Sequence, residues 1–240
     1  MNYGVTLNIR AYHFYVQVDF LNAMIGFQKA LKVLDTIDRD IFRRADVFRN
    51  IGKLNYQEED KEDAINYLLK ANDIYVSVDD YLYQAYTLTD IGNVYDKFKE
   101  YNTAIKFHQK SLELAEKYNF TDVKVNALGN LGGSFRELGE YQKALTYFNR
   151  QKPFLTYDMS LANQIIFLYQ IGYTYTLLNN SDTALEYLNK SLRLADSTNQ
   201  QNELKVALGL RAETFERFGD YKLALKDYRR MDIIEDSIFN

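Results

Sequence analysis

Apolar and small residues recur at spacings of three and four along most of the chain, and short polar breaks separate these runs. In residues 101–118 the recurring positions are Tyr101, Ala104, Ile105, His108, Ser111, Leu112 and Ala115. Such spacing places side chains on one face of a helix. The breaks hold only a few residues, as in KFKEYN, ELGEYQ, LNNSD and RFGDYK. The pattern therefore predicts antiparallel helical hairpins.

The same pattern returns every 40 residues. Alanines that follow the breaks stand at Ala64, Ala104, Ala144, Ala184 and Ala224. Upstream small residues stand at Gly52, Gly92, Gly132, Gly172 and Ala212. Aromatic residues keep the same register at Tyr95, Phe135, Tyr175 and Phe215. A hairpin that cannot bury its own apolar stripe does so by stacking on its neighbours, so an all-α solenoid is expected.

Composition agrees with a helical chain. The 240 residues include one proline and are 47% hydrophobic, with a formal net charge of −4 from interspersed charges. This charge distribution argues against direct nucleic-acid binding. No apolar run is long enough to span a bilayer, so no membrane insertion is expected within this segment.

The small residue of the first helix, the aromatic residue three positions later and the alanine of the second helix resemble the tetratricopeptide repeat family. An aromatic residue after the turn adds to the likeness, at Tyr101, Tyr141 and Tyr221. The family's usual repeat is 34 residues long, so longer helices are expected here. The resemblance implies a right-handed α-α superhelix of about six antiparallel helix pairs in a single domain, 1–240. Its units are expected at about 3–38, 44–78, 84–118, 124–158, 164–198 and 204–238.

The first of these units is degenerate, with Tyr12 and Met24 at the glycine and alanine places. Three glycines in LGNLGGSF need separate explanations, because a glycine inside a helix costs about 1 kcal/mol relative to alanine. Gly132 is expected where two helices approach closely. Gly129 and Gly133 share another face, and we expect them either to leave a bare patch of groove floor or to be tolerated substitutions.

In the family, this face of the first helices lines a concave groove. Projecting it along the chain gives the candidate protein- or peptide-binding residues Arg49, Lys53, Tyr56, Tyr86, Thr89, Asn93, Asp96, Asn126, Gly129, Gly133, Arg136, Tyr169 and Tyr173, followed by Thr176, Glu213 and Glu216. Arg and Lys side chains suit carboxylates, and Asn side chains suit a peptide backbone. A solvated polar face is the alternative. The lysine and asparagine pattern of C-terminal-carboxylate binders is matched only loosely.

No catalytic residue, metal site or cofactor is expected. The chain has no cysteine, which excludes thiolate chemistry. Its two histidines are His13, on the projected groove face, and His108, at a position that is Leu68, Phe148 or Leu188 in other units. His108 is therefore expected to be packed. Neither histidine has a metal partner four residues on, and no Gly-Lys-Ser/Thr follows the glycine cluster.

Two further features concern the ends of helices. Pro153 is expected to end or kink its helix near Lys152. The last helix keeps apolar residues that something should cover, either a second copy of the chain or a further C-terminal helix: Met231, Ile234 and Ile238. The tail YRRMDIIEDSIFN resembles the junction between repeats and output domain in bacterial tetratricopeptide-repeat regulators.

These observations predict a non-enzymatic module that binds a protein or an extended peptide, as the sensor or scaffold part of a bacterial signalling protein. Two alternatives stay open. One is a cytosolic peptide-responsive regulator that resembles quorum-sensing receptors, and the other is a structural subunit that pairs through its C-terminal helix. An exported sensor would be periplasmic, and a free-standing regulator cytoplasmic.

Overall fold

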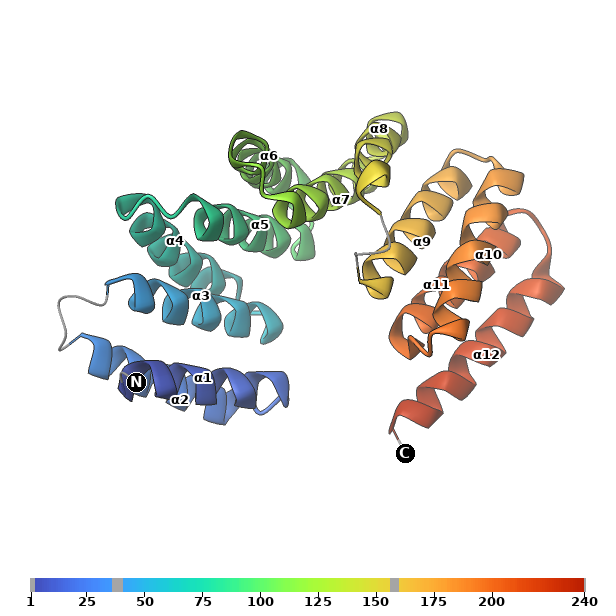
Figure 1. The fold of residues 1–240 in the computed structure, drawn as a ribbon. Coiled ribbons are helices and arrows are strands. Elements are labelled where there is room, and N and C mark those ends of the chain that lie inside the picture. The colour runs from blue at the N-terminus through green and yellow to red at the C-terminus, as the bar shows by residue number, and fades with distance from the viewer. Residues whose placement is uncertain (1–2, 36–40, 156–159, 240) are drawn as a thin grey trace. The chain divides into compact units, whose positions relative to one another are not determined.

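The computed structural model describes residues 3–35, 41–155 and 160–239, with side chains up to Asp236 in the last segment. These residues form α-helices, with one short 3-10 segment and no strand among them. The helices are α1 (Tyr3–Val16), α2 (Phe20–Leu34), α3 (Ile41–Gln57), α4 (Lys61–Ser77), α5 (Tyr81–Lys97), α6 (Tyr101–Tyr118), α7 (Thr121–Glu137), α8 (Tyr141–Gln151), α9 (Leu161–Leu177), α10 (Ser181–Ser197), α11 (Gln201–Arg217) and α12 (Tyr221–Phe239). The all-α fold of paired helices expected from the repeat is confirmed (Figure 1).

The chain divides into two units, residues 1–130 and 131–240, with the boundary inside α7. In unit 1 each helix contacts the next, from α1 to α6, and α3 also contacts both α1 and α5. In unit 2 consecutive helices from α8 to α12 are likewise in contact, and α9 also contacts α11. Within each unit the first helices of neighbouring pairs therefore lie against one another, and their free sides form a shared surface, here called the inner face.

Tight turns within the pairs produce the hairpins. Asp60 and Asn180 each accept a hydrogen bond at the N-terminus of the second helix, from the backbone N–H three residues on, which satisfies one unpaired donor of the helix. Just before the second helix, one residue is left-handed. In two of the turns this residue is a glycine, Gly139 with φ of 78° and Gly219 with φ of 86°, as the sequence predicts. Glu59, Lys99 and Asn179 adopt the same conformation in the other turns.

Close helix contacts explain the repeated glycines. A Cβ at Gly132 would lie 2.5 Å from Cε1 of Phe148, and one at Gly52 would lie 2.7 Å from Cγ of Leu68. Both distances are shorter than packed carbon atoms allow. The repeated alanines Ala64, Ala104, Ala144 and Ala184 are fully buried. The close approach predicted at Gly132 is confirmed.

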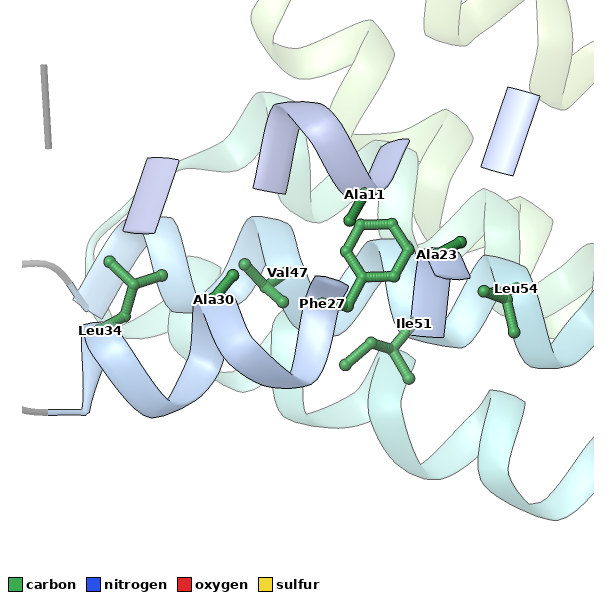
Figure 2. Close-up of a cluster of buried hydrophobic side chains, with 8 residues drawn as sticks. All are labelled: Ala11, Ala23, Phe27, Ala30, Leu34, Val47, Ile51 and Leu54. Atoms are coloured by element: carbon green, nitrogen blue, oxygen red, sulfur yellow. The ribbon is translucent and has the colours of Figure 1, made fainter. Parts of the chain in front are cut away.

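The first helix pair departs from the expected register. Ala11 and Ala23 are fully buried, whereas Tyr12 is 42% exposed. Figure 2 shows the Phe27 ring beside Ala11, within the buried cluster that these residues share with α3. Ala11 stands 41 positions before Gly52, so placing Tyr12 and Met24 at the packing positions was wrong by one residue.

Pro153 ends its helix early, as predicted. α8 stops at Gln151 after 11 residues, and Lys152–Phe154 form a 3-10 turn. Proline lacks an N–H and clashes with the preceding turn, which accounts for the short helix.

Unit 2 itself covers one of the three apolar residues of α12 and part of a second, so the expectation of an external cover is wrong for Ile234, whereas Ile233 beside it is 69% exposed. Ile234 is 7% exposed in a cluster with Ile165, Leu204 and Leu208, and Met231 packs against that cluster. The side chain of Ile238 lies outside the described residues. Ion pairs also fix α12 in place, between Arg211 and Asp227 at 2.7 Å and between Lys205 and Glu235 at 2.6 Å.

Alanine substitutions at two neighbouring glycines test this packing. We expect Gly132→Ala to lower the free energy of unfolding by about 2 kcal/mol, because the methyl group must displace the Phe148 ring. We expect Gly133→Ala to raise it by about 0.5–1 kcal/mol, because its Cβ would meet only Gln170 Oε1 at 3.7 Å and alanine favours the helix. Urea denaturation followed by circular dichroism measures both changes. Equal effects of the two substitutions would contradict the close contact.

Candidate functional site

Polar side chains join neighbouring first helices across the inner face of unit 1. Arg49 Nε of α3 donates to Asp90 Oδ2 of α5 at 2.6 Å, and the guanidinium lies 5.4 Å from the Tyr86 ring centroid. Asn50 Nδ2 of α3 donates to Asn8 Oδ1 of α1 at 3.1 Å. The predicted groove residues Arg49 and Tyr86 thus lie together, with the arginine charge already neutralised by a carboxylate.

Two hollows on this face share Lys53. The larger has a volume of about 320 Å³ and is lined by residues that include Asn8, Tyr12, Asp46 and Arg49. The smaller, about 100 Å³, is lined by residues that include Tyr56, Asp90 and Asn93. The structure therefore brings Arg49, Lys53, Tyr56 and Asn93 to neighbouring parts of one surface.

Lys53 has an unusual environment for a cation. Its ammonium lies 6.0 Å from the ring centroids of both Tyr12 and Tyr15. Within the described parts of the chain it forms no ion pair. Contact with the faces of aromatic rings stabilises a cation weakly at exposed positions, and this leaves the ammonium able to pair with a carboxylate.

Amides continue the polar face toward α7. Asn130 Nδ2 donates to Asn93 Oδ1 at 2.8 Å, which joins α5 to α7 within unit 1. Asn126 is exposed and Gly129 is partly exposed, both on the N-terminal half of α7. An asparagine side chain offers two donors and an acceptor with two lone pairs, so the Asn93 side chain can form further hydrogen bonds.

Two predicted groove residues instead serve contacts between helices. Thr89 is 8% exposed, and its Oγ1 lies 2.8 Å from Ser111 Oγ of α6. Asp96 Oδ2 accepts a hydrogen bond from Nε2 of the fully buried His108 at 2.9 Å. Thr89 is therefore not on the exposed surface, and the Asp96 carboxylate is held by α6. His108 is packed, as the sequence predicts.

The inner face of unit 2 centres on Arg136. Its Nη1 donates to Gln170 Oε1 at 2.9 Å, and its guanidinium lies 5.7 Å from the Tyr173 ring centroid. Gly133 lies one turn earlier, and a Cβ there would meet only Gln170 Oε1, at an ordinary contact distance of 3.7 Å. The structure thus groups Gly133, Arg136 and Tyr173 beside Gln170.

Burial changes the acidity of the tyrosines here. It raises the pKa of Tyr169 to about 12, and the charge of Glu203 adds to the effect. Burial also raises the pKa of Tyr173 to about 12, with a hydrogen bond to Glu213 as the second cause. Both phenols therefore stay neutral hydrogen-bonding groups at physiological pH.

Sequence reasoning missed several polar residues of this face, above all those that join neighbouring first helices. They stand 40 positions apart at Asn50, Asp90, Asn130 and Gln170. Their 40-residue spacing was thus the signal by which the sequence could have revealed them. Tyr12 was also missed as an inner-face residue because of the one-residue error in the first pair. The same error placed His13 on that face, but His13 lines neither of the two hollows described above.

Within the described residues, no three His, Cys, Asp or Glu side chains are grouped so that they could hold a metal ion. In the same part of the chain, every helix is too short or too polar to cross a bilayer.

The raised tyrosine pKa values give a pH dependence. A pKa above the unfolded value of about 10 stabilises the fold below pH 10, and this contribution is lost as the pH rises from 10 toward 12. We expect the ¹³Cζ NMR signals of Tyr169 and Tyr173 to titrate at higher pH than free tyrosine, whose pKa is about 10. Signals that move near pH 10 would contradict the described burial.

Comparison with known proteins shows which family this chain resembles. Models described as tetratricopeptide repeats match residues 43–117, 83–150 and 166–198. Outer dynein arm-docking complex subunit 4 of Danio rerio is 28% identical over 143 residues, which cover 60% of this chain and 27% of that protein. Response regulator aspartate phosphatase I of Bacillus subtilis (strain 168) is 25% identical over 205 residues, 80% of this chain and 50% of that protein.

Among solved structures, the Rap conjugation gene regulator of plasmid pLS20, in complex with the Phr* peptide, has a TM-score of 0.61 at 15% identity, over 97% of this chain and 73% of that one. This likeness shows the fold alone. The chain spans half or less of the two curated relatives named above. The repeat matches cover more than half of the sequence, and the chain belongs to the tetratricopeptide repeat family.

Proposed function

We propose that this chain is a binding module of a bacterial signalling regulator, and that it holds an extended peptide along the inner face of unit 1. The observation that carries the proposal is Lys53, a cation between two hollows with aromatic rings as its neighbours. A peptide carboxylate, from an acidic side chain or the C-terminus, would pair with it.

Arg49 has a different role in this proposal. Its bond to Asp90 at 2.6 Å already satisfies a charge, and both side chains are less than one-fifth exposed. A ligand carboxylate that approached Arg49 would meet the Asp90 carboxylate as well. Arg49 therefore holds α3 against α5 and shapes the hollow, and Lys53 provides the charge that attracts the ligand.

The amides would hold the peptide backbone. Asn93 and Asn130 form one hydrogen bond with each other, as Asn50 and Asn8 do. These bonds fix the orientation of the side chains. The donors and acceptors that remain on Asn93 and Asn50 can bind N–H and C=O groups of an extended chain, whatever its side chains.

The inner face of unit 2, taken by itself, suits a bulky uncharged ligand group. The Cβ position of Gly133 on α7 meets only Gln170, and beside it stand the Tyr173 ring and Arg136, whose charge is paired with Glu137 at 3.0 Å. Tyr169 and Tyr173 remain uncharged donors up to high pH because of their raised pKa values. A ligand backbone or aromatic side chain could approach α7 closely at this glycine.

The comparisons support a peptide-responsive regulator over the two other possibilities. A similarly folded solved regulator holds a peptide, and a Bacillus relative is named for a response regulator. The structural-subunit alternative relied on uncovered residues of α12; Ile234 is buried within unit 2 and gives it no support, whereas Ile233 is 69% exposed. A sensor or scaffold role of a larger protein uses the same surface and differs only in the event that peptide binding triggers.

We assign no reaction to this chain. His108 is enclosed and bound to Asp96, so neither group is presented to a substrate. The Bacillus relative is named a phosphatase, and the chain covers 50% of it. In our proposal, any such reaction of a longer protein depends on residues other than those of the inner face.

Selection of peptides from a random phage-displayed library tests the proposal. We expect the selected peptides to carry an acidic residue, and Lys53→Gln to weaken their binding about tenfold or more, as loss of a charge-assisted contact does. Asn93→Ala should also weaken peptide binding, because it removes a contact to the peptide backbone. Isothermal titration calorimetry gives the affinities.

Lys106→Gln is the matched control, because it removes an equal charge from the exposed side of the second helix α6. It should leave the affinity unchanged. Peptides that bind Lys53→Gln as tightly as the unmodified chain, or a library that yields no binders, would contradict the proposal.

A further inference from the structure

A third hollow lies on the other side of unit 1. Its volume is about 370 Å³, and α4, α5 and α6 line it with residues that include Asn72, Gln84, Leu88, Lys110, Leu114 and Lys117. α5 contributes to both sides of the unit. At 100° per residue, Gln84 and Leu88 stand opposite the inner-face residues Asp90 and Asn93. This outer hollow is therefore separate from the proposed peptide surface.

The outer hollow combines apolar side chains with positive charge. Leu88 is 6% exposed, and Leu114 stands beside it. Lys110 and Lys117, two turns apart on α6, have the rings of Phe107 and Tyr118 as neighbours, at 5.6 and 5.0 Å. Among the described residues neither ammonium forms an ion pair. Glu113 between them leaves the hollow with a net positive charge.

Two residues of the outer hollow differ from their counterparts in the repeat. The position of Asn72 is a buried leucine in two units, at Leu112 and Leu192, and a charged residue in the other two, at Lys152 and Asp232. Asn72 Oδ1 is buried without a hydrogen-bond partner, and such an acceptor costs stability that a leucine would not. The position of Lys117 is likewise Ser77 or Ser197 in other units. Both departures fall in one hollow and both add polar groups that a ligand could use.

We propose that the outer hollow is a second binding site, which takes an acidic segment of a partner protein with an aliphatic side chain next to its carboxylate. The aliphatic group packs on Leu88 and Leu114. The carboxylate pairs with Lys110 or Lys117 on the side away from Glu113, and rotation of the Asn72 amide toward the hollow lets its Oδ1 accept a hydrogen bond from a backbone N–H of the segment. The chain can thereby hold a peptide on one side of unit 1 and a partner on the other.

The probe is the peptide acetyl-Asp-Leu-Asp-Leu-Asp-amide, with acetyl-Lys-Leu-Lys-Leu-Lys-amide as its counterpart of opposite charge. Each is added at millimolar concentration to the ¹⁵N-labelled full chain. We expect the acidic peptide to shift the NMR signals of Asn72, Leu88 and Leu114 and the basic one to leave them in place. Signals that move only around Lys53 would overturn this second site and leave the inner-face proposal standing. Equal shifts with both peptides, or none, would also overturn it.

Asn72 and Lys117 can each be replaced by a residue that other repeats carry at the same position. These substitutions separate an effect on peptide binding from an effect on the stability of the fold. Asn72→Leu should raise the thermal midpoint by a few degrees and weaken the acidic peptide about tenfold. Lys117→Ser should weaken it to a similar extent without raising the midpoint. Lys70→Ser, which removes an exposed charge from α4 outside the hollow, is the control and should change neither. If Asn72→Leu stabilises the chain and binding is unchanged, Asn72 is not part of a site.

Discussion

The arrangement of the four central helix pairs depends on one close contact, in which a side chain of the second helix packs against a glycine of the first; Ala11 and Ala212 hold this position in the first and last pairs. Leu68 meets Gly52 in this way, and Phe148 meets Gly132, at distances that leave no room for a methyl group. The contact brings the two helices together and fixes which side of the first helix is covered. The opposite side is left to contact neighbouring first helices, so the polar bonds from Arg49 to Asp90 and from Asn50 to Asn8 follow from the same constraint.

The repeat could be read from the sequence because its signals are local rules of backbone and packing. A glycine at a left-handed turn, a proline that ends a helix and an alanine that recurs every 40 residues each have one structural explanation, and the structure has Gly139, Pro153 and Ala144 in those roles. The candidate site was harder to predict. A projection by 100° per residue places a residue on a face, but it cannot tell whether the neighbouring helix provides a partner. Thr89 and Asp96 stand at the border of the inner face, and α6 offers them Ser111 and His108.

Errors at the two ends of the chain share a cause. Sequence comparison extended the 40-residue spacing to the first pair, where the spacing is 41, so Tyr12 was assigned to packing although it lines a hollow beside Lys53. At the other end, the expectation of an external cover for α12 was based on how many apolar residues the helix contains. Their cover depends on α9, α10 and α11, which bury Ile234. Positions that vary from repeat to repeat are informative in unit 1: Lys53 and Asn72 stand at such positions, and each lines a hollow.

The central claim is that the close helix contact leaves a polar inner face for a peptide. A crystal structure of the full chain with a library-selected peptide measures this most directly. We expect the peptide to lie along α3 and α5, with a carboxylate within about 3 Å of the Lys53 ammonium and backbone hydrogen bonds to Asn93. A peptide seated on the second helices, or one that contacts α3 and α5 through apolar side chains alone with Lys53 unpaired, would contradict it.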